Sequence, residues 1–223
     1  MMQEKEYLEL HTEPLVPLDI MIDVDEFHKT MEKYKYAFRR WGLKHFEHRR
    51  YGLSLVNLNG ELENNPDPCC YPLDQWNKEL PESERIYDPA FRVPTDVLRE
   101  ECFDVCAPIL PYMVRSCILK WYDNSKFLPH IDTIIPSRSI RLWGTTSPEY
   151  VKFRFDENLT RGPKDMSKFD FKHKPHNISV EPGRLYLTDT NIIHDAVSTK
   201  NETFQFFIAL DNAASDVVEK LKL

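Results

Sequence analysis

The pattern of apolar and polar residues divides the chain into a helical first part and a β-rich second part. Near the N-terminus five large apolar residues recur at spacings of four, three, four and three: Phe27, Met31, Tyr34, Phe38 and Trp41. Such spacing is typical of an amphipathic helix that buries one face. We therefore expect a helix that is capped by Asp25, runs to about Trp41 and ends at Gly42.

The next segment predicts one strand and then a long irregular region. Residues 51–58 alternate as a strand does, and Asn59-Gly60 marks a turn. Residues 59–94 are rich in Pro, Asn, Asp and Glu, and the prolines exclude long regular elements. This region either covers a functional site or is a solvated excursion on the surface. A second helix is expected over residues 95–110, with Thr95 as its N-cap and Pro108 and Pro111 closing it.

From residue 115 onward the chain reads as short strands separated by Pro, Gly, Asn and Asp. The candidate strands cover residues 115–121, 139–143, 150–155, 177–180, 183–188, 194–198 and 203–210. Strands of this length predict a double sheet or barrel, and residues 215–223 predict a short terminal helix. We expect a single domain over 1–223, in which a helical and loop region, 1–114, packs on a β core, 115–211.

Composition narrows the class of protein. Hydrophobic residues make up 41% of the 223 residues and aromatic residues 12%, as in globular proteins. The net charge of −7 argues against a nucleic-acid-binding surface. No apolar run approaches the ~20 residues of a membrane span, and the polar N-terminus lacks a signal-peptide pattern. We therefore expect a soluble cytoplasmic protein that binds neither nucleic acid nor a membrane; the sequence leaves its oligomeric state open.

The cysteines do not form a disulfide pattern. There are five, at irregular spacing: Cys69, Cys70, Cys102, Cys106 and Cys117. An odd number without regular spacing favours core thiols in a reducing compartment over a disulfide framework or a metal site.

A histidine two residues before an acid occurs three times, and only the context distinguishes the three. The pairs are His11-Thr-Glu13, His45-Phe-Glu47 and His130-Ile-Asp132. The first lies near a terminus, and the second lies in a charged run, residues 44–50, that is typical of a solvated surface. The third follows an aromatic strand and an Asp-Asn-Ser turn. Alternation along a strand would place His130 and Asp132 on one face, where both can reach one ion.

A second histidine completes the candidate site. Pro182-Gly183 predicts a turn, the next residues a strand, and His194 opens the strand after that. We predict that His130, Asp132 and His194 are the metal ligands and the catalytic centre. Two imidazoles and one carboxylate suit Fe(II) with open positions, and they also accept Zn²⁺, Mn²⁺ or Co²⁺. A structural zinc site would need a fourth ligand, and His173 and His176 lie in a Lys-rich loop that we expect to be exposed.

At these residues the chain resembles the Fe(II)/2-oxoglutarate-dependent dioxygenases. The resemblance covers residues 115–211 and rests on Tyr122, His130-X-Asp132, Pro182-Gly183 and His194-Asp-Ala-Val197. Residues 137–146 make the chain most similar to the aspartyl/asparaginyl β-hydroxylase-like and small proline hydroxylase branch. The resemblance implies a mainly β fold with flanking helices, the double-stranded β-helix (jelly roll, cupin-like). It also implies Fe(II), 2-oxoglutarate and O₂, and hydroxylation of a C–H bond in an amino acid, peptide side chain or small metabolite.

The chain departs from that family at one position. The family places an Arg or Lys about ten residues after the second histidine, to bind the far carboxylate of 2-oxoglutarate, but residues 201–208 contain no basic residue. A carboxylate buried without a cation is costly. Arg141 is the first substitute and Arg138 the second, with hydrogen bonds expected from Tyr122, Thr203 and Gln205. Trp143 is expected either to contact the substrate or to belong to the core.

Two other functions remain open on the sequence. The missing basic residue favours a jelly-roll metalloenzyme that uses another cosubstrate. A non-catalytic metal-binding protein is the other alternative, although a complete His-Asp-His set speaks against it.

Overall fold

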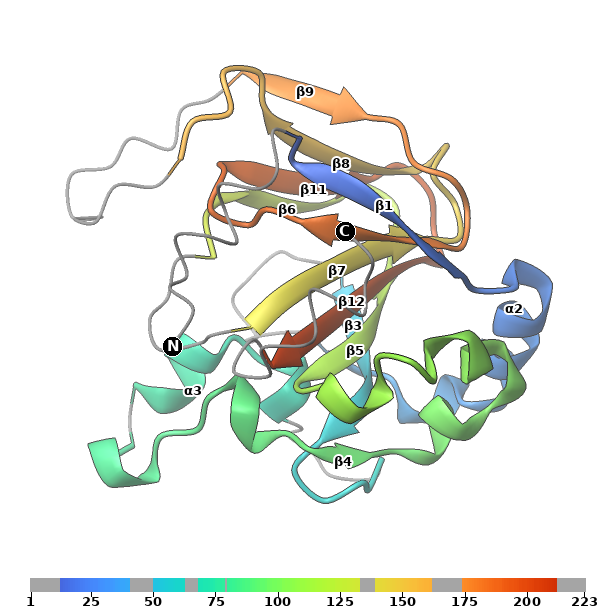
Figure 1. Ribbon diagram of the computed structural model, residues 1–223, viewed down its shortest axis with the longest axis vertical. Helices are drawn as coiled ribbons and strands as arrows, with labels where there is room; N and C mark the ends of the chain where they lie inside the picture. Colours follow the sequence, from blue (N-terminus) through green and yellow to red (C-terminus); the bar gives the residue numbers. More distant parts are fainter. Residues whose placement is uncertain are drawn as a thin grey trace.

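The computed structural model describes residues 13–40, 50–62, 68–78, 80–132, 139–161 and 174–211 (Figure 1). The region 215–223, expected to be helical, lies outside these residues. No helix in the described part of the chain is long and apolar enough to cross a membrane.

Two antiparallel sheets form the molecule. The larger has the strand order β1-β10-β7-β12-β5-β3-β2, with β4 paired to β3. Its strands are β1 (Leu15–Met21), β2 (Arg39–Arg40), β3 (Arg50–Asn57), β4 (Val93–Pro94), β5 (Ser116–Trp121), β7 (Ser139–Thr145), β10 (Arg184–Thr188) and β12 (Thr203–Asp211). The smaller has the order β6-β11-β8-β9. Its strands are β6 (Ser125–His130), β8 (Val151–Asp156), β9 (Pro175–Ile178) and β11 (His194–Ser198).

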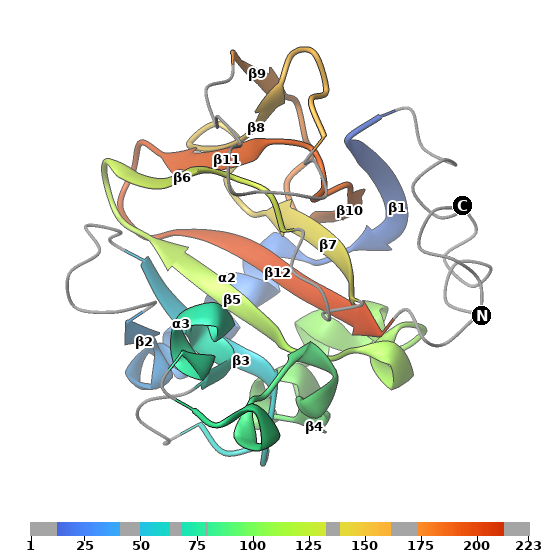
Figure 2. The ribbon, with the colours of Figure 1, turned by 90° about the vertical axis from the view of Figure 1, so that its left-hand side faces the viewer.

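The strands β5 to β12 form a jelly roll. Four of them lie in the larger sheet in the order β10-β7-β12-β5, and the other four make up the smaller sheet, which lies above the larger one in Figures 1 and 2. This arrangement is the double-stranded β-helix, so the predicted fold class is confirmed. The seven strands expected between residues 115 and 210 are all present, with ends that differ from the prediction by a few residues.

The larger sheet is buried on both faces. One face carries Leu142, Leu185, Phe206 and Ile208 toward the helical layer. The other, which we call the inner face, carries Leu119, Trp121, Trp143 and Tyr186 toward the smaller sheet. Because side chains alternate along a strand, Arg141 shares the inner face with Trp143, and Gln205 shares it with Phe207.

The first helix is shorter than predicted. It is α2 (Val24–Lys33), and Asp23, not Asp25, is the N-cap, since its Oδ1 accepts the N–H of Glu26 at 2.9 Å. The chain then makes a 3₁₀ turn, η1 (Lys35–Ala37), and enters β2. The expected continuation is wrong because Phe38 already has extended backbone angles. The C-terminal end expected for this helix, at residues 41 and 42, lies outside the described residues.

The second helix was predicted with the wrong geometry. Residues 95–110 form 3₁₀ segments, η5 (Asp96–Arg99) and η6 (Glu101–Cys106), and η7 (Leu110–Tyr112) follows. Glu100 interrupts them in an extended conformation, and its Oε1 accepts from Lys33 Nζ at 2.5 Å and Tyr34 Oη at 2.7 Å. Tertiary contacts with α2 therefore prevail over local helix propensity. Thr95 does not cap through its side chain; its hydroxyl donates to Ser54 O at 2.8 Å.

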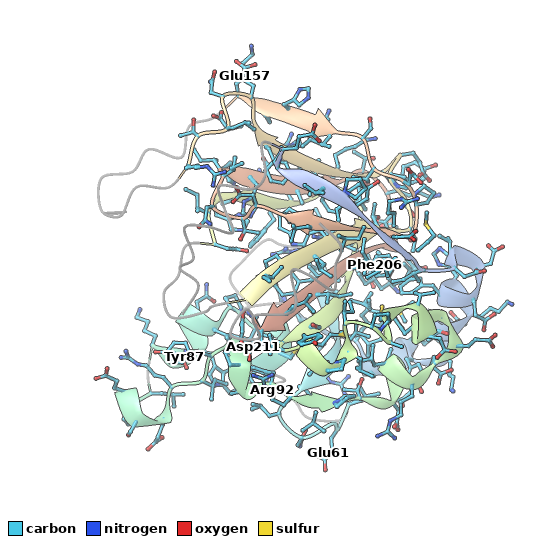
Figure 3. All side chains as sticks on the ribbon, in the orientation of Figure 1. Glu61, Tyr87, Arg92, Glu157, Phe206 and Asp211 are labelled. Carbon is cyan, nitrogen blue, oxygen red and sulfur yellow. The ribbon has the colours of Figure 1, made fainter. Side chains whose placement is uncertain are left out.

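The proline-rich region contains only short elements, as predicted. These are η2 (Pro68–Cys70), α3 (Leu73–Asn77), η3 (Glu82–Glu84), η4 (Asp88–Ala90) and β4. In Figure 3 the labelled Arg92, near the end of this region, lies beside Asp211 at the end of β12, and the two form an ion pair.

Two strands that matter for the site were not predicted. β1 contains Pro17 and β6 contains Pro129, and each lies at the edge of its sheet. Proline cannot donate to a strand ladder, so it is tolerated at edges, and it also weakens the strand signal in the sequence.

The predicted Pro182-Gly183 turn is confirmed; it leads into β10 and contacts the residue that follows β1. Gly183 has φ +79°, and its carbonyl accepts the N–H of Ile22 at 2.9 Å. A Cβ atom at this position would lie 2.2 Å from Ile22 O. Only glycine therefore fits this close approach.

The contact between α2 and the larger sheet predicts a large loss of stability on truncation. Phe27 is fully buried, and its ring packs edge-on against Phe204 and Phe206 with centroids 5.4 and 5.1 Å away. We expect Phe27→Ala to lower the free energy of unfolding by about 3–5 kcal/mol. Denaturant unfolding measures this. Tyr36→Ala is the control, because Tyr36 is 62% exposed; equal losses for both variants would contradict the packing described.

Candidate metal centre

Adjacent strands bring the two predicted histidines together. His130 ends β6 and His194 begins β11, and the two residues are register partners. Their Nε2 atoms lie 3.1 Å apart. Each Nδ1 lies close to the carbonyl two residues earlier, His130 at 2.8 Å from Leu128 O and His194 at 2.7 Å from Ile192 O. A carbonyl only accepts, so each Nδ1 carries a proton, and Nε2 is the nitrogen left to bind an ion.

The carboxylate of Asp132 completes the group. The backbone N–H of Asp132 donates to Thr190 O at 2.9 Å, which fixes the residue beyond the end of β6. One oxygen, Oδ1, is 3.4 Å from His130 Nε2, and the other, Oδ2, is 3.9 Å from Arg141 Nε. Burial by itself would raise the pKa of Asp132, but His130, His194 and Arg141 hold that pKa well below its usual range. The carboxylate is therefore ionised.

This geometry fits a divalent ion. All three ligand atoms lie within 4.8 Å of one another. Two nitrogens about 2.1 Å from one ion are separated by roughly 3.0–3.4 Å, which matches the Nε2 pair. The side chains of His130 and Asp132 are 23% and 27% exposed whereas His194 is fully buried, so the group opens on one side.

Arg141 reaches the metal centre but is also bound to the proline-rich region. Its guanidinium is 9% exposed, and Nη2 lies 2.6 Å from Asp88 Oδ2. Asp88 begins η4 and is 1% exposed, so residues 59–94 do contribute beside the site. Within the described part of the chain, Arg141 Nε and Nη1 make no hydrogen bond.

Thr203 and Gln205 both lie on the inner face, on β12. Thr203 is paired with Trp121, and its hydroxyl lies 2.8 Å from Ser198 Oγ, so this side chain is engaged in the β11–β12 connection. Gln205 is 4% exposed, and its Oε1 has no hydrogen-bond partner among the described residues.

The structure does not bring Tyr122 to the other predicted residues. Its ring packs edge-on against Tyr51 with centroids 5.4 Å apart, and Lys120 Nζ lies 5.6 Å from the ring centroid. Arg138, His11, His45 and His173 lie outside the described residues. His176 is exposed on β9, as expected.

Trp143 packs beside a metal-ligand candidate. Its ring centroid is 5.0 Å from that of His194, and the residue is 4% exposed. The indole Nε1 has no hydrogen-bond partner in the part of the chain that the structure describes. Asp195, which follows His194, forms an ion pair with Arg154 on β8 through two hydrogen bonds of 2.6 Å each.

Sequence reasoning missed Arg50. The charged run 44–50 was expected to be a solvated surface, but Arg50 begins β3 and is 2% exposed. Its Cζ lies 4.9 Å from the Trp121 ring centroid and 3.9 Å from that of Phe127. The alternation of side chains along β3 was the available signal. Leu53 and Leu55 face the helical layer, so Arg50, an odd number of residues away, faces the smaller sheet.

The cysteines are buried thiols, as predicted. All five are buried, and no two of them form a disulfide. Burial raises the pKa of Cys102 to about 11 and that of Cys106 to about 12, so both are neutral thiols near pH 7. The Sγ atoms of Cys69, Cys70 and Cys117 lie within 4.8 Å of one another. Cys69 Sγ lies 3.3 and 3.4 Å from the carbonyls of Val56 and Ser116.

Comparison with known proteins supports the fold. The sequence matches no protein family model and no curated protein. Among solved structures, SnoN, a non-haem α-ketoglutarate-dependent epimerase from nogalamycin biosynthesis, is similar with a TM-score of 0.50 and 10% identity, over 89% of this chain and 79% of that one. SnoK, the α-ketoglutarate-dependent carbocyclase of the same biosynthesis, has a TM-score of 0.50 and 14% identity, over 94% and 84%.

A third similar structure, from Burkholderia pseudomallei, is described as a 2OG-Fe(II) family oxidoreductase. Its TM-score is 0.47 at 12% identity, over 91% of this chain and 87% of that one. At these identities the likeness to SnoN and SnoK shows the shared jelly-roll fold. It does not single out the aspartyl/asparaginyl or proline hydroxylase branch that the sequence resembles, so that branch stays a prediction.

The metal centre predicts a histidine-specific loss of metal binding. We expect His194→Ala to weaken Co²⁺ binding at least about a hundredfold, because it removes one of three ligands and leaves the other two poorly fixed. Titration followed by the visible Co²⁺ spectrum measures this. His176→Ala is the control, since it removes an exposed imidazole elsewhere. Equal binding by both variants would contradict the site.

Proposed function

We propose that this protein is an Fe(II)- and 2-oxoglutarate-dependent oxygenase whose metal-binding core is residues 115–211. The observation that carries the proposal is the convergence of His130 Nε2, His194 Nε2 and the Asp132 carboxylate on one partly open point. Two imidazoles and one carboxylate with open positions are the ligand set of non-haem iron oxygenases. With such a set, iron, 2-oxoglutarate and O₂ together supply oxidation of a C–H bond, with release of succinate and CO₂.

The protein's own residues prepare the site before any ligand arrives. The carbonyls of Leu128 and Ile192 hold both imidazoles in the tautomer that binds metal through Nε2. The Asp132 carboxylate lies between His130 and Arg141, with one oxygen toward each, and it supplies negative charge for the ion. The open side next to His130 and Asp132 leaves access for cosubstrate and substrate.

Two buried arginines on the inner face, Arg141 and Arg50, are candidates to bind the far carboxylate of 2-oxoglutarate. Arg141 is the register partner of Ala209, near the end of β12, and lies beside Asp132. It is therefore at the metal end of the roll. In 2-oxoglutarate the keto acid end chelates the ion and two methylene groups carry the far carboxylate away from it. An arginine adjacent to a metal ligand is in the wrong place for that far carboxylate.

Arg50 is better placed. In the register of the larger sheet, Thr203 on β12 faces Trp121 on β5, and Trp121 faces Arg50 on β3. Thr203 lies nine residues after His194, close to where the resemblance implies a basic residue, so Arg50 would supply a cation at the same depth from two strands away. The Phe127 ring lies 3.9 Å from the Arg50 guanidinium and 4.0 Å from the His130 ring centroid. A single aromatic ring thus separates the cation from the metal ligand.

Neighbouring polar atoms support an anion at this depth. Trp121 is fully buried, and its indole N–H has no hydrogen-bond partner among the described residues. An unpaired buried donor is costly unless a ligand accepts from it. Burial lowers the pKa of Arg50 to about 9, which leaves the guanidinium charged near pH 7. With Arg50 as the anchor, the lack of a basic residue on β12 no longer favours another cosubstrate.

The type of oxidation belongs to the proposal as well. SnoN and SnoK are described as an epimerase and a carbocyclase, so α-ketoglutarate-dependent proteins of this fold serve more than one outcome. We assign hydroxylation of an amino acid, peptide side chain or small metabolite, with Trp143 in contact with the substrate next to His194. The unpaired Trp143 N–H supports that contact.

The proposal predicts a spectroscopic signature. Anaerobic addition of Fe(II) and then 2-oxoglutarate should produce the weak visible metal-to-ligand charge-transfer band of a chelated 2-oxo acid. His130→Ala should lose the band, because it removes a ligand, and His176→Ala should keep it. Iron binding by the wild-type protein without the band would defeat the proposed cosubstrate.

The Arg50 anchor predicts a loss of discrimination between 2-oxo acids. Wild-type protein should bind 2-oxoglutarate more tightly than 2-oxovalerate, which has a methyl group in place of the far carboxylate. Arg50→Met should reduce 2-oxoglutarate affinity roughly tenfold to a hundredfold and leave 2-oxovalerate affinity nearly unchanged. Band titration gives both constants, so a general loss of structure is recognised because it weakens both ligands.

Arg40→Met is the matched control, since Arg40 is an exposed arginine on the neighbouring strand β2. If Arg141→Gln instead of Arg50→Met removes the discrimination, the anchor is Arg141, as the sequence suggested.

A further inference from the structure

Arg141 has binding capacity that the proposed metal and cosubstrate sites do not use. It is more than nine-tenths buried, and one of its nitrogens, Nη2, is held by Asp88 at 2.6 Å. Its Nε and Nη1 make no hydrogen bond with any residue that the structure describes. Buried charged donors without acceptors are costly, so they mark a place where a ligand supplies the acceptor.

These donors lie next to the metal centre. Arg141 Nε is 3.9 Å from Asp132 Oδ2, whereas Asp132 Oδ1 faces His130. The guanidinium therefore stands across the carboxylate from the imidazole. The distance exceeds that of a hydrogen bond, so Asp132 does not satisfy the Nε–H.

The guanidinium is positioned before a ligand binds. Asp88 is 1% exposed and lies between two arginines, with Oδ2 on Arg141 and Oδ1 3.5 Å from Arg115 Nη1. The Phe207 ring packs below, 5.0 Å from Arg141 Cζ. A side chain held from two sides loses little conformational entropy when it binds.

The charges around the site favour a monoanion. The two arginines and Asp88 together carry one excess positive charge. Under the proposed function, a divalent ion, Asp132, doubly charged 2-oxoglutarate and Arg50 sum to zero. One positive charge beside the metal centre is then left for the substrate to neutralise.

We propose that Arg141 binds the carboxylate of the primary substrate, so that the substrate is a small carboxylic acid that carries one net negative charge. This inference rests on the proposed function and names its substrate class. The carboxylate accepts a hydrogen bond from one of these two donors, which point from different edges of the guanidinium, and the C–H bond to be oxidised lies a few bonds away, toward the metal. Trp143, two residues along β7 on the same face, bounds the substrate on the side of His194.

The test uses the anaerobic Fe(II)–2-oxoglutarate protein and its charge-transfer band, which shifts when a substrate binds beside the ion. The probes are small carboxylic acids with one net negative charge, each compared with its primary amide. We expect at least one acid to shift the band and its amide to bind at least about tenfold more weakly. Equal binding of acid and amide, or no response to any acid, overturns the inference.

A variant series separates recognition from positioning. Arg141→Gln should weaken binding of the responsive acid at least about tenfold, remove the preference over the amide, and leave 2-oxoglutarate affinity within about twofold. Arg184→Gln is the control, because Arg184 lies on β10 in an ion pair with Glu181. A large loss of 2-oxoglutarate affinity in Arg141→Gln would make Arg141 a cosubstrate residue and refute the inference.

Failure of the inference and failure of the proposed function give different results. If wild-type protein forms no band with Fe(II) and 2-oxoglutarate, the proposed function fails before any acid is added. If the band forms and no acid perturbs it, only the substrate class is wrong. The comparison of acid with amide in the wild-type protein needs no variant, so it stands even if Arg141→Gln does not fold.

Discussion

The site depends on one repeated contact, in which each histidine donates its Nδ1–H to the carbonyl two residues before it. Leu128 O and Ile192 O make the same contact on adjacent strands, and the β6–β11 register then brings the two Nε2 atoms to 3.1 Å. The two imidazoles are thereby placed where one ion can be bound by both Nε2 atoms. Asp132, ionised by the same surroundings, supplies the negative charge that the cation requires.

In the larger sheet, a basic residue at the same position on the inner face can come from any of several neighbouring strands. Thr203, Trp121 and Arg50 lie side by side on β12, β5 and β3 and share one face. A cation on any of these strands reaches the same volume between the sheets. A missing basic residue on β12 is therefore weak evidence against a dicarboxylate ligand when β3 extends the jelly roll and carries a buried arginine.

The sequence predicted the features that follow from local pattern and missed those that need tertiary contacts. Alternation located seven strands, and the His130–Asp132 and His194 motifs identified residues that the fold brings together. The 3₁₀ geometry after Thr95 was not predictable, because Glu100 is fixed by Lys33 and Tyr34 from a distant segment. Arg50 was missed for a related reason. Its charged neighbours in the sequence indicated exposure to solvent, but Phe127 on β6 of the smaller sheet covers its guanidinium.

The two buried arginines illustrate a general constraint on polar interiors. A guanidinium enters a core only where partners or ligands offset its desolvation. Arg50 is stacked between aromatic rings, and Arg141 is held by Asp88. They lie at opposite ends of the inner face, one deep and one beside Asp132. A site that binds two anions together needs its cations separated in this way, because adjacent cations would draw one anion to both positions and leave the second ligand unbound. The spacing of Arg50 and Arg141 therefore suits the proposed reaction, in which cosubstrate and substrate would each bring a carboxylate to one metal.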